Sequence, residues 1–389
     1  MKHRIVILGA GYAGATAAGR LARRLHPGDT EITVVNADAD FVERVRLHQL
    51  ATGQHLRRRE LSEIFAGTGV RVRVAHVAAV DPDARTVTLD DGEIGYDTLV
   101  YALGSAAAGV PEHAYNVSGR DAALRLRDRL ATLSSGGTVL VAGGGLTGLE
   151  AVTEIAEAHP GLAVALATRG ALGDWLDEKA RRHLRGVLER LGVTVHEHTD
   201  VVRVETAVAG TSEGRLLPAD VTVWAAGFAV HPLAAATTLR VAGTGQIAVD
   251  KMMRSFSHPD VYAVGDAAIA DGPGGRPLRM ACASAVPMAW RAADDIVGRL
   301  TGRRVRKTPL RYVNQCISLG RGDGIIQFVT ADDRATPSLI TGRTAARFKE
   351  IVCRGAAWEV AHPTLAMPSR RRRLAPAHAD SRTASPVSR

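Results

Sequence analysis

The sequence is poor in cysteine. Its 389 residues include three, Cys282, Cys316 and Cys353, all in the last third of the chain. None of them belongs to a CxxC pair, the spacing typical of redox disulfides and of zinc sites. The odd number and the wide spacing argue against a disulfide framework, and we expect no metal site.

Long hydrophobic runs and aromatic residues are also scarce. No apolar run approaches the roughly 18–20 residues that cross a bilayer. The N-terminal MKHRIVILGAG passes directly into a glycine loop, which favours a buried strand over a signal peptide. Aromatic residues make up 4% of the chain, too few for a base-stacking surface. We therefore expect a cytoplasmic protein with no integral membrane segment and no nucleic-acid partner.

Acidic residues are outnumbered, since the formal net charge is +9, but much of the excess lies at the C-terminus. Residues 370–389 contain six arginines and one acid, Asp380, among serine, proline and alanine. This composition predicts a basic, disordered tail over 367–389. The alternative is a tail that binds an acidic surface of a membrane, a nucleic acid or a partner.

Glycine, in contrast, is abundant and follows apolar runs. RIVIL at 4–8 and ITVVN at 32–36 predict buried parallel strands, and between them GAGYAG at 9–14 opens a helix. This βαβ unit recurs in TVLVAGGGLTGLEAVTEIAEAHPG at 138–161, which leads into the strand LAVALATRG at 162–170. The internal repeat predicts an α/β protein with two copies of a nucleotide-binding architecture.

The other segments extend these two copies. VRVRVAHVAAVDPDARTVTLDDG at 70–92 alternates and carries turn signals, which predicts antiparallel strands. YDTLVYALGS at 96–105 and ADVTVWAAG at 219–227 predict buried strands of one plan, and DWLDEKARRHLRGVLERLG at 174–192 predicts an amphipathic helix. From about residue 306, two strands and a helix predict a small α+β cap.

Each glycine loop has the spacing that binds a dinucleotide. In the first, Gly9 allows a tight turn, Gly11 lets a pyrophosphate approach the backbone, and Gly14 lets helix and strand pack closely. The helix that follows offers N–H groups and the positive end of its dipole. The second loop repeats the spacing with Gly143, Gly145 and Gly148. Two such sites indicate hydride transfer from a nicotinamide to a flavin.

Together these motifs resemble the two-dinucleotide-binding flavoproteins of the pyridine nucleotide-disulfide oxidoreductase superfamily. GAGYAG, YALGS, GGGLTGLEAVTE, WAAGF and VYAVGDAA stand in the family's order and spacing between residue 4 and about residue 300. The chain is most similar to type II NADH dehydrogenases and apoptosis-inducing-factor-like oxidoreductases. The resemblance implies FAD at the N-terminal site and NADH or NADPH at the second.

The resemblance also implies the domain plan: two Rossmann-like domains, the second inserted in the first, and a small C-terminal α+β cap. We assign residues 1–106 and 246–305 to the FAD-binding domain, 107–245 to the NAD(P)H-binding domain and 306–366 to the cap. A homodimer formed through the cap is an expectation from the family.

Several site residues follow from the resemblance. Asp266 of VGDAA contacts FAD near its ribityl and phosphate groups. Glu150 lies close to the flavin where the nicotinamide stacks, and Glu154 lies near the flavin and the acceptor, so both acids are candidate catalytic residues. The alternative is that these acids only complement the dipole of their helix. Further positions that match cofactor-binding residues are Ala13, Gly104, Leu146, Thr147, Gly227 and Gly265.

Two departures from the family concern the nucleotides. The second strand of the FAD site usually ends in an acid that binds the adenosine ribose. Here it ends in Asn36, which still donates and accepts hydrogen bonds, and Asp38 is a possible substitute. At the second site the strand runs into Arg169, which accommodates a 2′-phosphate and favours NADPH over NADH. The alternative is that Arg169 is a solvated loop charge.

The segment after the first unit departs as well. It contains no CxxxxC motif, so the disulfide reductases of the superfamily are not expected. FVERVRLHQLATG at 41–53 is similar to the family stretch beside the flavin, with Arg44-Val45 in place of Thr-Pro. Arg44 or Arg46 stabilises an anionic reduced flavin or holds a phosphate, unless it is a surface charge. His48 is a candidate proton donor to the acceptor, or a hydrogen-bonded structural histidine.

The acceptor side departs furthest. Quinone-reducing members carry AQxAxQQ after the GD motif, where Cys282, Val286 and Pro287 stand here. Members that reduce membrane quinone end in an apolar amphipathic anchor, whereas this chain ends in a basic tail. Both differences argue against respiratory quinone reduction. Cys282 lies near the flavin or is a buried inert thiol. Cys316 and Cys353 do not match the cysteines of sulfide-oxidising relatives, and we assign them structural roles.

The sequence therefore predicts an FAD-dependent NAD(P)H oxidoreductase without a redox disulfide. Its electron acceptor is expected to be a small quinone-like or other conjugated molecule. Three alternatives remain: a reductase of an acidic ferredoxin- or rubredoxin-type partner, a flavin enzyme acting on one dedicated metabolite, and a redox-sensing flavoprotein.

Overall fold

The computed structural model describes residues 1–304, 310–365 and 370–376. The predicted boundary near residue 305 and most of the predicted tail, 377–389, lie outside the described residues. Among the described residues, no helix is both long and apolar enough to cross a membrane.

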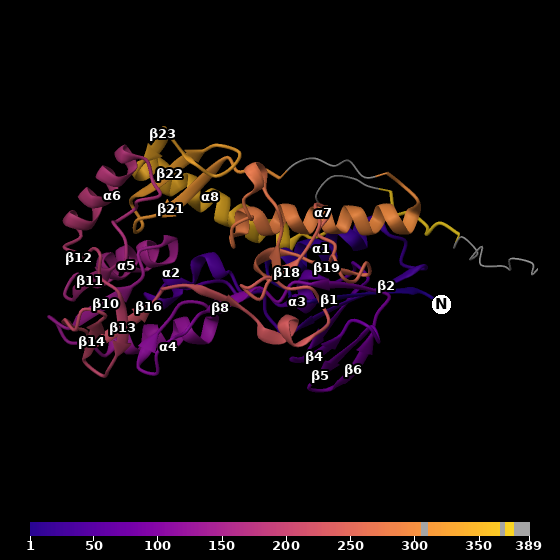
Figure 1. The fold of residues 1–389 in the computed structure, drawn as a ribbon, viewed down its shortest axis with the longest axis horizontal. Helices are drawn as coiled ribbons and strands as arrows, with labels where there is room; N and C mark the ends of the chain where they lie inside the picture. Colours follow the sequence, from indigo (N-terminus) through magenta and orange to yellow (C-terminus); the bar gives the residue numbers. More distant parts are fainter. Residues whose placement is uncertain (305–309, 366–369, 377–389) are drawn as a thin grey trace, which may run out of the picture.

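The first layer of the fold is a parallel five-stranded sheet with the order β19-β7-β1-β2-β3. Its strands are β1 (His3–Leu8), β2 (Thr30–Asn36), β3 (Val70–Val74), β7 (Thr98–Tyr101) and β19 (Val261–Ala263). Helices α1 (Tyr12–Arg24) and α7 (Cys282–Thr301) lie together on one side of it in Figure 1. Residues 5–8 of β1 are all buried, which explains the apolar run IVIL after the exposed Arg4.

The prediction for residues 70–92 was wrong over its first five residues. Strand β3 pairs with β2 in parallel, Val72 opposite Val34, at the edge of the first sheet. Its alternating VRVRV pattern reflects an edge strand that is half exposed, not an antiparallel ribbon. The antiparallel strands follow it as a separate sheet: β4 (Val77–Asp81), β5 (Thr86–Leu89) and β6 (Gly92–Gly95).

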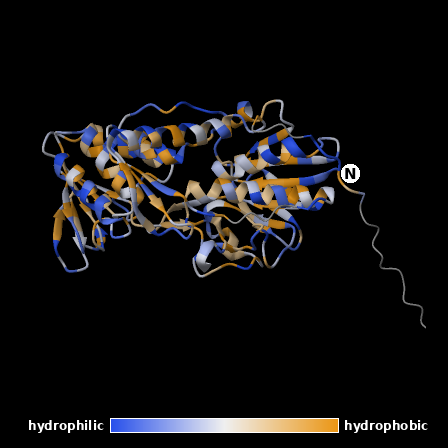
Figure 2. Ribbon diagram, turned by 90° about the horizontal axis from the view of Figure 1, so that it is seen from above, coloured by the Kyte–Doolittle hydropathy of each residue, from blue (hydrophilic) through white to orange (hydrophobic). Residues whose placement is uncertain are grey.

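A second parallel five-stranded sheet repeats the plan with the order β12-β11-β10-β16-β9. Its strands are β9 (Ala114–Tyr115), β10 (Thr138–Ala142), β11 (Ala163–Ala167), β12 (Thr194–His196) and β16 (Val221–Trp224). Its helices are α4 (Arg120–Ala131), α5 (Leu146–Ala158) and α6 (Glu178–Arg190), and an antiparallel sheet adjoins it with β13 (Val201–Val204), β14 (Val208–Thr211) and β15 (Leu216–Pro218). In Figure 2 the hydrophobic strands of the two sheets lie inside two lobes.

The internal repeat extends to the register. In the first sheet Leu8 of β1 faces Val35 on one side and Tyr101 on the other. In the second sheet Ala142 of β10 faces Ala167 and Trp224 in the same way. The predicted α/β fold with two Rossmann-like units is therefore confirmed.

A short antiparallel ribbon runs between the lobes (Figure 1). It consists of β8 (Ser105–Ala107), which follows the first sheet's β7, and β17 (Phe228–Val230), which follows the second sheet's β16. Phe228 faces Ala107 in the ribbon, and Trp224 Nε1 donates a hydrogen bond to Ala108 O at 2.8 Å.

The predicted cap forms after the first gap, residues 305–309. It contains the antiparallel strands β21 (Asn314–Ser318), β22 (Gly324–Val329) and β23 (Ala335–Thr341), followed by α8 (Gly342–Ala361). The remaining short elements are η1 (Arg44–Arg46), α2 (Leu47–Ala51), α3 (Leu61–Ile64), η2 (Pro232–Ala236), β18 (Ile247–Ala248), η3 (Gly265–Ala267), β20 (Ala268–Ile269) and η4 (Pro273–Gly275).

Residues 370–376 differ from the expected disordered tail. Arg372 N–H donates to Arg24 O at 2.9 Å, and Arg372 O accepts from His26 N–H at 2.9 Å. The Arg373 guanidinium lies 2.8 Å from the Asp29 carboxylate. These contacts dock the segment against the end of α1, because backbone pairing and an acidic partner are available there. Composition alone does not reveal either contact.

Candidate active site

The larger cavity, of about 890 Å³, lies at the carboxyl ends of the first sheet. Ligands of parallel α/β sheets bind at this edge because loops and helix N-termini converge there. The residues that follow β1, β2, β7 and β19 line the cavity: Gly9, Asn36, Gly104 and Asp266. The cap completes it with Lys349 and Cys353 from α8, so the cavity is built by segments from across the chain.

The first glycine loop has the shape that a pyrophosphate requires. A Cβ on Gly14 would lie 1.8 Å from Gly9 O, so this glycine is dictated by helix packing. Gly9 has φ +93°, and a Cβ there would lie 2.4 Å from Ala102 O. A Cβ on Gly11 meets no protein atom within 4 Å. Gly11 lines the cavity at the uncapped N-terminus of α1, which leaves room for an anion on the helix N–H groups.

The second cavity, of about 450 Å³, lies at the equivalent edge of the second sheet. A Cβ on Gly148 would lie 1.8 Å from Gly143 O, which reproduces the packing of the first loop. A Cβ on Gly145 again meets nothing within 4 Å. Both loops therefore provide a cradle for a dinucleotide.

Neither strand after a glycine loop ends in an acid. Asn36 Oδ1 accepts from Ala10 N–H at 2.8 Å, and Asn36 Nδ2 donates to Asp38 O at 2.7 Å. The side chain thus ties the end of β2 to the glycine loop. Thr168 takes the equivalent place at the end of β11, where a Cβ on Gly144 would lie 2.4 Å from Thr168 Oγ1. Both positions offer neutral hydrogen-bonding groups to a ribose.

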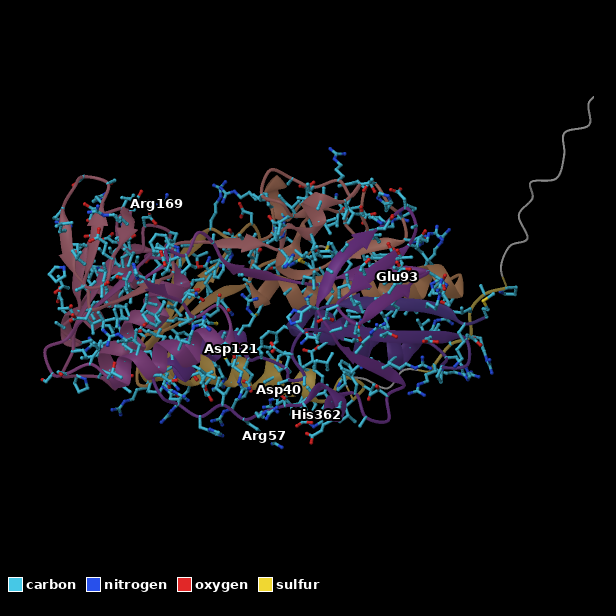
Figure 3. The ribbon with its side chains drawn as sticks, turned by 90° about the horizontal axis from the view of Figure 1, so that it is seen from below. Asp40, Arg57, Glu93, Asp121, Arg169 and His362 are labelled. Atoms are coloured by element: carbon cyan, nitrogen blue, oxygen red, sulfur yellow. The ribbon has the colours of Figure 1, made fainter. Side chains whose placement is uncertain are left out.

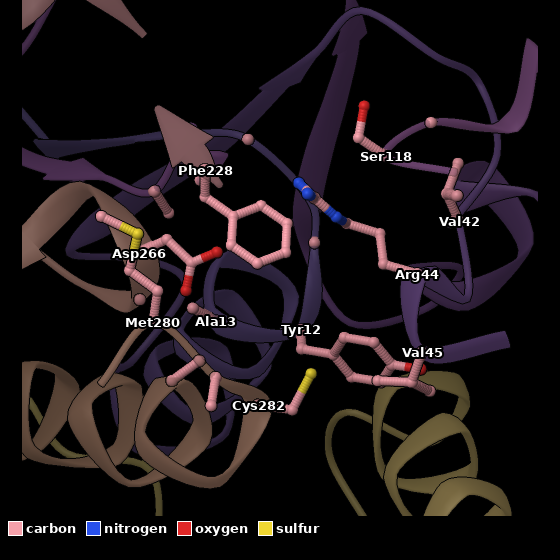
Figure 4. A pocket seen from close by; sticks show the side chains of 18 of the residues that line it. Tyr12, Ala13, Val42, Arg44, Val45, Ser118, Phe228, Asp266, Met280 and Cys282 are labelled. Atoms are coloured by element: carbon pink, nitrogen blue, oxygen red, sulfur yellow. The ribbon is translucent and has the colours of Figure 1, made fainter. Parts of the chain in front are cut away.

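Two opposite charges project into the larger cavity, as Figure 4 shows. Asp266 Oδ2 accepts from Ser105 Oγ at 2.6 Å, and the Arg44 guanidinium donates to Ser105 O at 2.6 Å. A Cβ on Gly265 would lie 3.2 Å from Ala13 Cβ, so the GD motif packs directly on the first helix. Arg44 is therefore a cavity residue, whereas Arg46 does not line it.

Glu150 forms a buried ion pair that the sequence analysis missed. Its carboxylate accepts hydrogen bonds from Lys349 Nζ of α8 and from Ser318 N–H of β21, the latter at 3.0 Å. Burial opposes both charges, yet Lys349 holds the pKa of Glu150 below its usual value, and Glu150 raises the pKa of Lys349. Lys349 Nζ also donates to Cys316 O at 3.1 Å. Both residues line the larger cavity.

His48 lies beside this pair and also lines the cavity. Its Nε2 is buried and has no hydrogen-bond partner among the described residues. Burial lowers the pKa of His48 to about 4, so the ring is neutral at pH 7. A neutral imidazole donates one hydrogen bond and accepts another, but it does not act as an acid at pH 7. His48 is therefore a neutral side chain in the cavity wall, and its Nε2 is available for a hydrogen bond.

The two cavities meet. Five residues line both of them: Leu146, Thr147, Ala225, Gly227 and Phe228. Leu146 and Thr147 begin α5, directly after the second glycine loop. One end of a dinucleotide held on that loop therefore reaches the larger cavity. Hydride transfer between two bound nucleotides needs this arrangement.

Comparison with known proteins agrees with this geometry. The model of the pyridine nucleotide-disulphide oxidoreductase family matches residues 3–295. The chain belongs to this family. An NADH dehydrogenase-like protein of Mycobacterium tuberculosis is 30% identical over 353 residues, which cover 83% of this chain and 87% of the relative. The demethylphylloquinone reductase of Synechocystis is 25% identical, and the match covers 83% of this chain and 86% of the relative.

Solved structures show the same fold. The sulfide:quinone oxidoreductase of Aquifex aeolicus has a TM-score of 0.78 at 19% identity and covers 94% of this chain and 93% of that one. An NDH2 of Plasmodium falciparum in complex with NADH has a TM-score of 0.77 at 14% identity, and the match covers 94% of this chain and 97% of that one. As a member of the pyridine nucleotide-disulphide oxidoreductase family, the protein is an FAD-dependent NAD(P)H oxidoreductase.

Glu154, the second acid on α5, lies outside the larger cavity in this family member. Its side chain is 2% exposed, and Oε1 accepts from Gln54 and lies 3.2 Å from Arg321 Nε. Its Oε2 is buried without a hydrogen-bond partner among the described residues. Burial raises the pKa of Glu154 to about 7, although Arg321 opposes the shift.

This shift predicts a pH-dependent stability. The folded protein keeps a proton on Glu154 up to about pH 7, whereas the unfolded chain releases it near 4.5. The free energy of unfolding should therefore fall as the pH rises from about 4.5 to 7, by at most about 3 kcal/mol. Glu154→Gln should remove this part of the slope in urea unfolding measured between pH 4 and 8. An unchanged slope would mean that Glu154 titrates normally.

All three cysteines line the larger cavity, on α7, β21 and α8. Burial raises the pKa of Cys282 to about 12 and that of Cys316 to about 11, and it raises that of Cys353 as well. The thiols therefore remain un-ionised at pH 7 and form part of the apolar lining of the cavity. Spacing in the sequence gave no sign that they converge on one cavity.

Proposed function

We propose that the protein passes a hydride from NADPH to FAD and then passes electrons to a small, apolar, conjugated acceptor such as a quinone. The observation that supports this most is the meeting of the two glycine-loop cavities at Leu146, Thr147 and Phe228. FAD, when bound, supplies the two-electron chemistry. The protein's own residues bind and orient the two nucleotides and exclude water from the site.

Each of these roles falls to particular residues. Gly11 and Gly145 leave space for the two pyrophosphates. Asp266 and Arg44 supply one charge of each sign to the wall of the FAD cavity. Lys349 remains protonated beside Glu150 and offers N–H donors to a carbonyl oxygen of the acceptor or to a developing negative charge.

The rim of the cavity supports an apolar acceptor. Val286 and Pro287 of α7 and Val352 of α8 line it. Val352 is 45% exposed. The demethylphylloquinone reductase and the type II NADH:quinone oxidoreductases among the relatives act on quinones by name, which agrees with this class. A polar cosubstrate would leave these side chains in contact with water.

The preference for NADPH rests on Arg169. It lies in the second cavity, 75% exposed, with Nε 3.9 Å from Asp200 Oδ1. Figure 3 shows it on the lobe of the second sheet, remote from Asp40. No acid stands at the end of β11 to bind a 2′-hydroxyl, so the arginine is available to a 2′-phosphate.

Arg169→Ala should lower kcat/KM for NADPH about tenfold, the loss expected for one solvent-exposed charge-assisted hydrogen bond. The kcat/KM for NADH should stay within about twofold of the wild-type value. Arg203→Ala is the matched control, because Arg203, on β13, pairs with Glu205 and does not line the cavity. Equal losses for both dinucleotides, or none, would contradict the preference.

We further propose a cytoplasmic homodimer with the domain assignment given above. Exposed apolar side chains on α8, Phe348, Ile351 and Trp358, support a second copy as the partner of this face. Light scattering of the purified protein tests the dimer, and a monomer at micromolar concentration would contradict it.

The function as a whole is tested by steady-state kinetics with NADPH and a short-chain soluble quinone. Turnover that saturates in both substrates is the expected result. Oxidation of NADPH that does not depend on any added quinone would contradict the proposed acceptor class.

A further inference from the structure

Phe228 stands in the passage between the two cavities. Of the five residues that line both, it is the only aromatic one. Phe228 is 45% exposed, and its side chain projects into the larger cavity near Asp266 and Arg44, as Figure 4 shows. A phenyl ring held at the junction of two cavities favours contact with a flat apolar surface.

The backbone beneath Phe228 fixes this position. Phe228 begins β17, one strand of the ribbon that connects the two sheets, and faces Ala107 of β8. Gly227 before it has φ +128° and accepts from Ala108 N–H at 3.1 Å. The Trp224 indole holds the same Ala108 through its carbonyl. The side chain is therefore placed relative to both lobes at once.

We propose that Phe228 binds the nicotinamide ring of NAD(P)H by stacking, and so positions it for hydride transfer. This inference rests on the proposed function. A dinucleotide on the second glycine loop extends past Leu146 and Thr147, and Phe228 lines both cavities together with these two residues. Nicotinamide is a planar aromatic ring, cationic in the oxidised form, and it must pass this point to reach the larger cavity.

The test compares Phe228→Ala with Phe228→Tyr. Calorimetric titration with NADP⁺ should show affinity reduced about three- to tenfold for Phe228→Ala, the loss typical of one aromatic contact, and unchanged within twofold for Phe228→Tyr. Stopped-flow bleaching of the flavin by NADPH should slow in Phe228→Ala and not in Phe228→Tyr. Phe256→Ala is the matched control, because Phe256 is 60% exposed and lines neither cavity.

Affinity and bleaching of Phe228→Ala within twofold of the wild type would overturn the inference. Equal losses in Phe228→Tyr would also overturn it, because they would indicate a role in the ribbon rather than stacking. Failure of the proposed function looks different: the wild-type flavin itself would not be bleached by NAD(P)H. The titration with NADP⁺ would still decide the role of Phe228.

Discussion

Gly11→Ala should weaken FAD binding without unfolding the protein. A Cβ at Gly11 meets no protein atom within 4 Å and points into the space that the pyrophosphate needs. An extra methyl in a packed contact costs about 1–3 kcal/mol, which corresponds to a roughly 5- to 150-fold loss of affinity. Flavin absorbance of the purified variant and titration of apoprotein with FAD measure this loss.

Gly145→Ala is the matched variant at the second loop, where a Cβ also meets nothing within 4 Å. It should retain FAD and lose affinity for NADP⁺ by a similar factor. Each variant thus tests one cavity and serves as the control for the other. Loss of FAD from Gly145→Ala, or full retention of FAD by Gly11→Ala, would show that the cavities are assigned to the wrong nucleotides.

Lys349→Met should lower the free energy of unfolding by about 3–5 kcal/mol, because it leaves the Glu150 carboxylate buried without its cation. The two side chains are only 12% and 16% exposed, so water does not replace the lost contact. Urea unfolding at pH 7 measures the change. Stability should partly recover at lower pH, where Glu150 takes up a proton.

The double variant Glu150→Gln/Lys349→Met is the control. Removal of both charges should restore most of the lost stability, because a neutral pair avoids the buried unpaired carboxylate. A loss below about 1 kcal/mol in Lys349→Met would indicate that the pair is solvated. The double variant should still show slow reduction of the acceptor, since the N–H donors of Lys349 are missing.

The glycine loops could be predicted from the sequence because each glycine answers a local constraint. Gly14 and Gly148 lie against the carbonyl of the first glycine in their own loop, five residues earlier. The strands that precede them are buried on both faces and therefore read as continuous apolar runs. Local spacing thus identified both loops and the repeated strand order.

Long-range contacts could not be predicted in this way. Lys349 reaches Glu150 across 199 residues of sequence, and nothing in either segment marks the other. Phe228 follows a recognisable glycine, but its place between two cavities depends on how the two lobes are joined. The resemblance implies a place for Glu154 near the flavin, but it does not reveal that Glu154 is buried against Gln54 and Arg321.

The cap was expected only to form a dimer interface, but it also builds part of the larger cavity. It contributes Lys349 and Cys353 from α8 and residues 314–316 from β21 to the cavity that fits FAD. It also anchors Glu150 through Ser318 N–H. Removal of the cap should therefore weaken FAD binding, in addition to any effect on assembly.

The most direct test of the account is an anaerobic titration of the purified protein with NADPH, followed by its visible spectrum. We expect a bound-flavin spectrum that is bleached by one equivalent of NADPH and recovers when a quinone is added. A protein that binds FAD but is not bleached by NADPH or NADH would contradict transfer between the two cavities.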